Sequence, residues 1–230
     1  MKLEQVSTNV YRIAFGFVNA YLILGEEDVT VVDTGMPGSA PGILSALEGV
    51  EREPGDVGRI VLTHLHYDHT GSVTALRKHL NAPVLMHPAD AALLRDGRVV
   101  RDFLPAPRAW ARLMVAGMRG IPTTIEPVSV EEEVTDGRIL AEARGARVIH
   151  VPGHTEGQIA LLVPEDGGVL IAADAASNFL RLDYPPIFED LDRGRDSLRR
   201  LGGERFETAC FGHGRVMRRN AAAAFQRRFA

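Results

Sequence analysis

The sequence predicts a mixed α/β protein of the α+β class, in which two mixed β-sheets pack face to face and helices cover the outside. Strand-type and helix-type patterns alternate along most of the chain, and several short strands open it. The chain has 230 residues, of which 45% are hydrophobic and 24% charged, so it can bury a full core. Two packed sheets with outer helices account for such a mixture of elements.

The opening segment predicts a meander of strands. Runs 10–15 and 20–24 are rich in β-branched and aromatic residues, and Gly16 and Gly25 end them. Beyond residue 32, the apolar spacing changes to the period of a helix and back several times. Helices are expected at about 38–48, 70–80, 88–95, 192–202 and 219–229, and strands near 59–63, near 83–86 and around 126–172. No internal repeat is found, and residues 1–230 are expected to form a single domain.

The composition limits the cellular location and the classes of binding partner that are expected. One cysteine excludes a disulfide framework, so a cytoplasmic location is expected. The amino-terminal residues lack the apolar core of a signal peptide, and no stretch approaches the length that crosses a bilayer. The net charge of −4, with basic residues spread along the chain, gives no electrostatic case for nucleic acid. A small-molecule substrate is therefore expected, with no nucleic acid and no membrane.

The densest chemical signal is the run from His64 to His69. His64, His66, Asp68 and His69 are four candidate metal ligands within six positions. The first two should share one side as the preceding strand leaves the sheet, with the other two at the turn before a helix. A lone histidine is more often a core or surface residue, but this pattern indicates a metal site. Imidazole and carboxylate ligands without a thiolate favour zinc, with iron or manganese as competitors.

Three more candidate ligands lie far along the chain, each where an apolar strand ends. They are His154, Asp174 and His213. Seven candidate ligands are too many for one tetrahedral zinc and suit two ions that share a bridge. The sequence therefore predicts a dinuclear centre of two divalent metal ions.

In order and type, these positions resemble the metallo-β-lactamase superfamily, and the resemblance covers nearly the whole chain. Residues 29–35, Val-Thr-Val-Val-Asp-Thr-Gly, look like the family's first landmark. The resemblance implies a four-layer αββα sandwich with metals at one edge, where strand ends converge. It also implies that one metal is held by His64, His66 and His154 and the other by Asp68, His69 and His213, with Asp174 bridging them.

Other polar residues have competing interpretations. By the resemblance Asp33 would orient the ligands, although turn chemistry alone also accounts for it. His79, His87 and His150 match no ligand position, and Cys210 is expected to be a buried strand residue.

Residues 98–125 form a segment that the sequence explains least. A helical stretch from Arg108 to Arg119 is bracketed by prolines. It predicts a core helix, a lid over the metal site, or a contact in a homodimer. A lid would imply a substrate with an apolar portion. The apolar face of this stretch consists of Trp110, Leu113, Met114 and Met118.

These residues predict a metal-dependent hydrolase in which a metal-bridging hydroxide attacks a carbonyl or phosphoryl group. The resemblance implies that the substrate is a lactone, ester or thioester. Asp174 and Asp68 would fix the bridging water and pass its proton to the leaving group. Tyr184 is a candidate oxyanion donor or acid, and its alternative role is a packed aromatic ring. The chain looks most like the lactonase and glyoxalase II-like branch, although small residues, with Ser177 three positions on, replace the tyrosine that lactonases carry after the bridging aspartate.

Two other functions stay open at this point. One is a mononuclear iron enzyme similar to sulfur dioxygenases, acting on glutathione persulfide. The other is a phosphodiesterase or a non-catalytic relative. The metal content and the reaction would separate these from the hydrolase.

Overall fold

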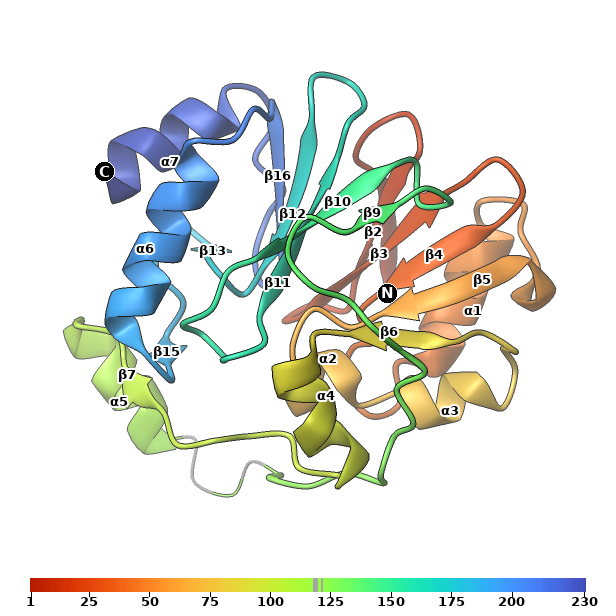
Figure 1. The fold of residues 1–230 in the computed structure, drawn as a ribbon, viewed down its shortest axis with the longest axis horizontal. Coiled ribbons are helices and arrows are strands. Elements are labelled where there is room, and N and C mark those ends of the chain that lie inside the picture. The colour runs from red at the N-terminus through yellow and green to blue at the C-terminus, as the bar shows by residue number, and fades with distance from the viewer. Residues whose placement is uncertain (118–119, 121) are drawn as a thin grey trace.

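The protein is built on a seven-stranded sheet and a five-stranded sheet that face each other (Figure 1). The computed structural model describes residues 1–117, 120 and 122–230. In the larger sheet, antiparallel strands β1 to β4 are followed by parallel neighbours. Its order is β1 (Lys2–Gln5), β2 (Val10–Ala14), β3 (Asn19–Leu24), β4 (Val29–Val32), β5 (Val57–Val61), β6 (Val84–Met86) and β8 (Glu132–Glu133).

The smaller sheet is also mixed, because β12 pairs in parallel with β16 while its other pairs are antiparallel. Two short strand pairs lie outside both sheets, β13 (Ser177–Asn178) with β14 (Leu182–Asp183) and β7 (Leu104–Pro105) with β15 (Ile187–Phe188). The order of the smaller sheet is β16 (Thr208–Phe211), β12 (Val169–Ala173), β11 (Ile159–Val163), β10 (Ala146–His150) and β9 (Ile139–Leu140).

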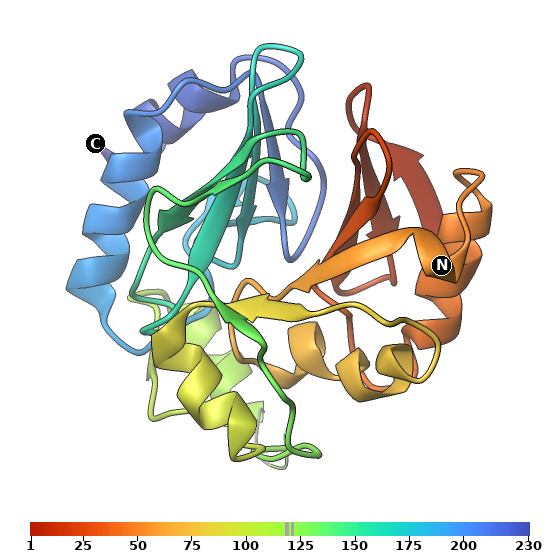
Figure 2. The same ribbon diagram turned by 45° about the vertical axis from the view of Figure 1, so that its right-hand side comes forward.

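Helices cover the outer sides of the two sheets. In Figures 1 and 2, α6 and α7 lie against the smaller sheet, and α1 and α3 lie beneath the larger one. The helices are α1 (Ala40–Glu48), α2 (Tyr67–Thr70), α3 (Val73–Arg77), α4 (Pro88–Arg95), α5 (Ala109–Gly117), α6 (Leu191–Gly202) and α7 (Ala221–Phe229), with a 3₁₀ turn at Pro54–Asp56. In the part of the chain that the structure describes, no helix combines the length and hydropathy needed to cross a membrane.

Three apolar clusters separate the layers, and the alternation of side chains along β3 shows why. Leu22 points to the cluster shared with α1, α3 and α4, while Tyr21 and Ile23 point to the cluster between the sheets. A third cluster joins the smaller sheet to α6 and α7 through residues such as Leu198 and Phe225. The predicted mixed fold, with two facing sheets and outer helices, is confirmed.

The predicted helix at 70–80 is wrong in its bounds, because the chain forms two short helices, α2 and α3. Gly71 and Ser72 separate them, and the Ser72 hydroxyl donates to the Met36 carbonyl and accepts from the Ser39 N–H. Such side-chain bonds compete with a continuous helix. Asp68 and His69 therefore lie inside α2 rather than at a turn before it. The preceding strand also ends earlier than expected, at Val61.

The segment 98–125 contains β7 and α5 and does not form a core helix. Only Ala111 of α5 is buried, whereas Trp110 is 46% and Leu113 77% exposed. The core interpretation of this apolar face is therefore wrong for these residues. Met118 and Arg119, which the prediction included, lie outside the described residues.

Candidate metal centre

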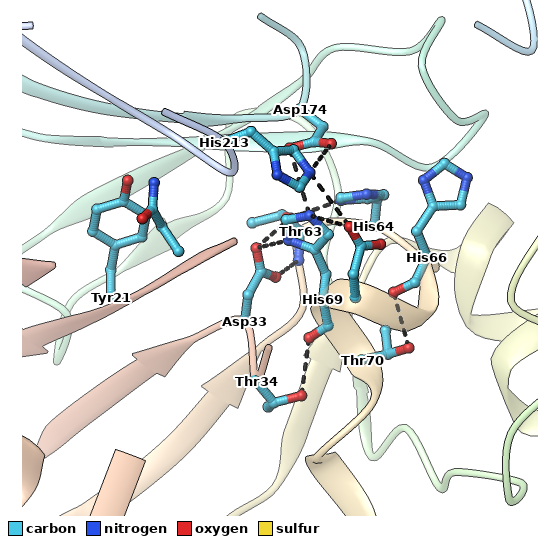
Figure 3. Close-up of polar contacts among 12 residues, drawn as sticks. Tyr21, Asp33, Thr34, Thr63, His64, His66, His69, Thr70, Asp174 and His213 are labelled. Atoms are coloured by element: carbon cyan, nitrogen blue, oxygen red, sulfur yellow. Dashed lines mark hydrogen bonds and ion pairs between the residues drawn. The ribbon is translucent and has the colours of Figure 1, made fainter. Parts of the chain in front are cut away.

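All seven candidate ligands come together where strands of both sheets end. His64 and His66 lie in the loop between β5 and α2, and Asp68 and His69 follow in α2. From the smaller sheet, His154 lies in the β10–β11 loop, Asp174 follows β12, and His213 follows β16. Figure 3 shows Asp174 and His213 reaching the cluster from one side and His64 and His69 from the other. The facing of the two sheets thus brings together residues up to about 150 positions apart.

The ligand-type atoms fall into three overlapping groups, within each of which they lie at most 4.8 Å apart. These groups are His64–His66–His154, Asp68–His69–His213 and His64–His69–Asp174. The first two match the triads that the family resemblance implies, and the third joins a histidine of each triad to Asp174.

Asp174 lies between the triads. One carboxylate oxygen is 3.5 Å from His154 Nε2 and 3.1 Å from His213 Nε2, and the other is 3.5 Å from His69 Nε2. The strand pairing shifts register just before it, and Ala173 has a left-handed φ of 46°. This irregular end of β12 directs Asp174 toward the cluster. The close approach also requires Gly212, since a Cβ there would collide with the Asp174 carboxylate.

Hydrogen bonds at Nδ1 fix the orientation of four of the histidine rings. His154 Nδ1 donates to the Ile187 carbonyl at 3.0 Å, and His213 Nδ1 donates to the Phe17 carbonyl at 2.9 Å. A carbonyl oxygen only accepts, so each Nδ1 carries a proton and Nε2 is the nitrogen that faces the Asp174 carboxylate. Ligand histidines are typically oriented by partners of this kind.

Asp33 orients the other two rings. It accepts from His69 Nδ1 at 2.9 Å and from both the backbone N–H and the hydroxyl of Thr63 at 2.8 Å (Figure 3). Since the Thr63 hydroxyl donates to Asp33, its oxygen can accept from His64 Nδ1 at 3.0 Å. The left-handed φ of 59° at Asp33 belongs to this arrangement rather than to a simple turn. In the structure Asp33 therefore contacts the ligands as the resemblance implies.

Burial keeps the histidines of the His64–His66–His154 triad neutral. It lowers the pKa of His66 to about 3, with a further contribution from His154, and it also lowers the pKa of His64 and His154. A neutral imidazole is the form that binds a metal ion.

In the Asp68–His69–His213 triad, the carboxylates of Asp68 and Asp174 determine the direction of the histidine pKa shifts. Burial opposes charge on His69, but Asp174 and Asp68 outweigh it and raise the pKa of His69 to about 9. The same carboxylates raise the pKa of His213 against the effect of burial. In turn, the neighbouring histidines outweigh burial and hold the pKa of Asp68 and Asp174 below its ordinary range.

The residues fit a metal centre. Within the part of the chain that the structure describes, three buried atoms in this cluster have no hydrogen-bond partner: His64 Nε2, His69 Nε2 and Asp174 Oδ1. Buried polar atoms are normally paired, and unpaired ones mark a place for an ion or water. Nitrogen and carboxylate donors of this kind suit divalent metals such as zinc.

A pocket of about 1250 Å³ opens over the cluster. Its floor includes His66, Asp68, His154, Asp174 and His213. Described residues of the segment 98–125, among them Arg101, Trp110 and Met114, form part of its wall. The apolar part of the lining consists of Phe17, Val99, Val100, Phe103, Trp110, Met114, Pro122, Phe179, Pro186 and Ile187.

Tyr184 is not brought into the cluster. Its ring packs against Phe188 and Phe229 and lies beneath the Arg228 guanidinium. Among the described residues, it is not part of the pocket lining, while Ser177 is. The geometry thus favours the packed aromatic ring over the oxyanion donor.

The residues expected to lie outside the ligand set do so among the described groups. His87 and His150 stack on each other with ring centroids 4.0 Å apart. Cys210 is buried in β16, as expected, and burial raises the pKa of its thiol to about 12.

Several supporting residues were not predicted from the sequence. Thr63 and the carbonyls of Phe17 and Ile187 hold ligand rings, yet nothing in their residue types indicates it. Tyr21 was also missed: its hydroxyl donates to the Phe211 carbonyl at 2.6 Å and accepts from the Phe211 N–H at 3.0 Å. This contact joins β3 to the end of β16 and so supports His213.

Known proteins resemble this chain in sequence and fold. Uncharacterized protein YobT of Bacillus subtilis is 32% identical over 159 residues, and the match covers 69% of this chain and 61% of YobT. An N-acyl homoserine lactonase of Bacillus sp. is 25% identical over 181 residues, which cover 68% of this chain and 62% of the lactonase. The chain thus spans less than two thirds of the length of these two relatives.

Among solved structures, a metallo-beta-lactamase of Cronobacter sakazakii has a TM-score of 0.73 at 20% identity, covering 93% of this chain and 78% of its own. At that identity the likeness concerns the fold alone. The family model described as the metallo-beta-lactamase superfamily matches residues 13–213, a span that includes all seven candidate ligands. With that match and the His/Asp centre at the meeting of its two sheets, this chain belongs to the metallo-beta-lactamase superfamily.

Proposed function

We propose that this protein is a dinuclear zinc hydrolase that cleaves a lactone, ester or thioester with an apolar portion. The observation that carries the proposal is the position of Asp174. One of its oxygens faces His154 of the first triad, and both face histidines of the second. A carboxylate shared by two triads supports two ions with a common bridge rather than a single ion.

The donor set supports zinc. Five imidazoles and two carboxylates form the cluster, without a thiolate to select a softer metal. When bound, two such ions supply an activated water and polarise the oxygen of the scissile group.

The carboxylates supply the proton chemistry. Asp68 is the most accessible side chain among the ion-paired ligands, at 16% exposure, and it lines the pocket. Its Oδ2 lies 3.4 Å from His213 Nε2, and His69 and His213 outweigh burial and hold the pKa of Asp68 below its ordinary range. Asp68 is therefore ionised, which is the form that can take up a proton from the attacking water. We assign to Asp68 and Asp174 the transfer of the proton from the attacking water to the leaving oxygen or sulfur.

The pocket supports an apolar substrate of some length. Its volume of about 1250 Å³ exceeds the range of roughly 300–1,000 Å³ that is usual for small-molecule sites. Phe17, Trp110 and Phe179 line it while remaining about half exposed. Exposed aromatic rings in a pocket gain from covering by an apolar ligand. The relative named as an N-acyl homoserine lactonase also favours an acylated lactone.

A hydrolysis panel tests the proposal. The purified protein would be assayed with acyl lactones, aryl esters, thioesters, phosphodiesters and β-lactams, each before and after treatment with a chelator. We expect turnover of a lactone, ester or thioester that increases with acyl length, disappears with chelation and returns with Zn²⁺. Turnover that survives complete metal removal would contradict the proposal, as would hydrolysis confined to phosphodiesters or β-lactams.

A further inference from the structure

Asp90, in the first turn of α4, is fully buried although it belongs neither to the seven ligands nor to the pocket lining. Its carboxylate accepts four hydrogen bonds. Oδ2 accepts from the Leu65 N–H at 3.1 Å and from the Thr155 hydroxyl at 2.7 Å. Oδ1 accepts from the Gly157 N–H at 2.9 Å and from Arg101 Nη1 at 2.7 Å. A buried carboxylate requires partners of this number, because its desolvation is costly.

The donors to Asp90 flank the histidines of one triad. Leu65 lies between His64 and His66, and Thr155 directly follows His154. Asp90 therefore joins the two loops that carry the whole His64–His66–His154 triad. These loops are about 90 residues apart in sequence, and α4 stands between them as the common support.

We propose that Asp90 is the positioning residue for the His64–His66–His154 half of the metal centre. The inference rests on the dinuclear site proposed above. Asp33 holds the His69 ring of the other half directly and reaches His64 only through Thr63. Asp90 contacts only the loops that carry His64, His66 and His154, so a change at Asp90 should disturb that half more than the other.

The packing around Asp90 is tight on the His154 side. A Cβ on Gly157 would lie 2.5 Å from the Asp90 Cγ and 2.7 Å from its Cβ. Glycine at this position therefore allows the turn after His154 to approach the carboxylate. A methyl group there would move the turn away while leaving the charge of Asp90 intact.

Arg101 provides the counter-charge from the pocket side. It also donates to the Ala89 carbonyl and, at 3.3 Å, to Glu189, which accepts from the Glu156 N–H at 2.6 Å. Arg101 and Glu189 both line the pocket. The network thus joins the loop after His154 to the segment that forms the pocket wall.

Two variants disturb this arrangement in different ways. Asp90→Asn keeps the side-chain shape but replaces one acceptor oxygen with an NH₂ group and removes the negative charge. At least one hydrogen bond is lost in either orientation of the amide, because among the four donors only the Thr155 hydroxyl can also accept. Gly157→Ala keeps the carboxylate and displaces the turn. Gly55→Ala is the matched control, since a Cβ at Gly55 has no atom within 4 Å and its φ is not left-handed.

The measurement is a calorimetric titration of the metal-depleted proteins with Zn²⁺ in a competing chelator. His154→Ala and His213→Ala identify which binding step belongs to which half. We expect Asp90→Asn and Gly157→Ala to weaken the His154 step by about 10–100-fold, as is usual when a partner that orients a ligand is lost. The other step should stay within about twofold, as should both steps in Gly55→Ala.

The outcomes separate this inference from the proposed function. A stoichiometry of one Zn²⁺ per chain in the wild type would refute the dinuclear site, and with it the assignment of Asp90 to one half. Two wild-type steps that are unchanged in both variants, or weakened equally, would overturn the role of Asp90 alone, because equal loss indicates general destabilisation. Thermal unfolding of the metal-depleted proteins reports folding, and Gly157→Ala decides the question if Asp90→Asn does not fold.

Discussion

Phe179→Ala should reduce the hydrolysis of long-chain substrates much more than that of short ones. Phe179 follows β13, lines the pocket and is 46% exposed. Its ring centroid lies 5.9 Å from that of Phe17 and 5.9 Å from that of His213. An acyl chain that leaves the metal cluster on this side would cover the ring.

The exposed part of the ring sets the size of the effect. An aromatic side chain presents about 150–250 Å², so an exposure of 46% leaves about 90 Å² for a substrate to cover. At about 25 cal/mol per Å², full coverage is worth about 2 kcal/mol and half coverage about 1 kcal/mol. We therefore expect kcat/KM for a decanoyl substrate to fall by about 5–30-fold, mainly through KM, and that for its acetyl counterpart to change by less than about twofold.

The assay is steady-state hydrolysis of the two substrates, with the metal content of each protein measured in parallel. Leu180→Ala is the matched control: Leu180 is the next residue and is 99% exposed, but it is not in the pocket lining. An equal loss for both chain lengths at unchanged metal content would refute the reasoning, as would an equal effect of Leu180→Ala.

Three further predictions concern separate parts of the molecule. Asp174→Ala removes the carboxylate shared by the two triads. Metal should therefore be lost from one or both sites, and turnover should fall by several orders of magnitude while the fold is retained. Unchanged metal content and rate in this variant would contradict the prediction. Burial opposes charge on Asp136, but hydrogen bonds from Arg200 and the His150 N–H outweigh it and lower its pKa. Asp136→Asn should therefore unfold at a lower temperature than wild type at pH 7. This difference in unfolding temperature should shrink as pH falls from about 3.9 through the lowered pKa of Asp136. A difference that stays constant from pH 7 to 2 would count against this prediction. The Cys210 thiol is buried with its pKa raised to about 12, so it should react with iodoacetamide at pH 8 only after denaturation, and rapid labelling of the folded protein would disprove this.

The candidate ligands could be predicted because residue type carries their signal. Histidine and aspartate residues next to the ends of apolar runs indicate both metal binding and its position at a sheet edge. The meander and helices α4, α6 and α7 were also predicted within a few residues. The spacing of apolar residues within each of these segments is enough to indicate a strand or a helix. The break between α2 and α3 was missed because it depends on Ser72 contacting the distant Met36 and Ser39.

The supporting groups were not predictable for a different reason. His154 and His213 are oriented by backbone carbonyls, which every residue possesses and no sequence pattern marks. Asp90 looks like an ordinary acidic residue in the first turn of a helix, and only the fold places the loops of His64 and His154 around it. Tyr184 is the opposite case: its side chain suits the chemistry and lies near the candidate ligands in sequence, but its ring packs against Phe188 and Phe229.

We propose that seven residues hold two metal ions, with Asp174 between them. Anomalous diffraction at the zinc edge, on crystals of protein loaded with Zn²⁺, tests it most directly. We expect two peaks per chain, one beside His64, His66 and His154 and one beside Asp68, His69 and His213, with the Asp174 carboxylate in contact with both. A single peak in fully loaded protein, or two peaks of which only one contacts Asp174, would contradict it.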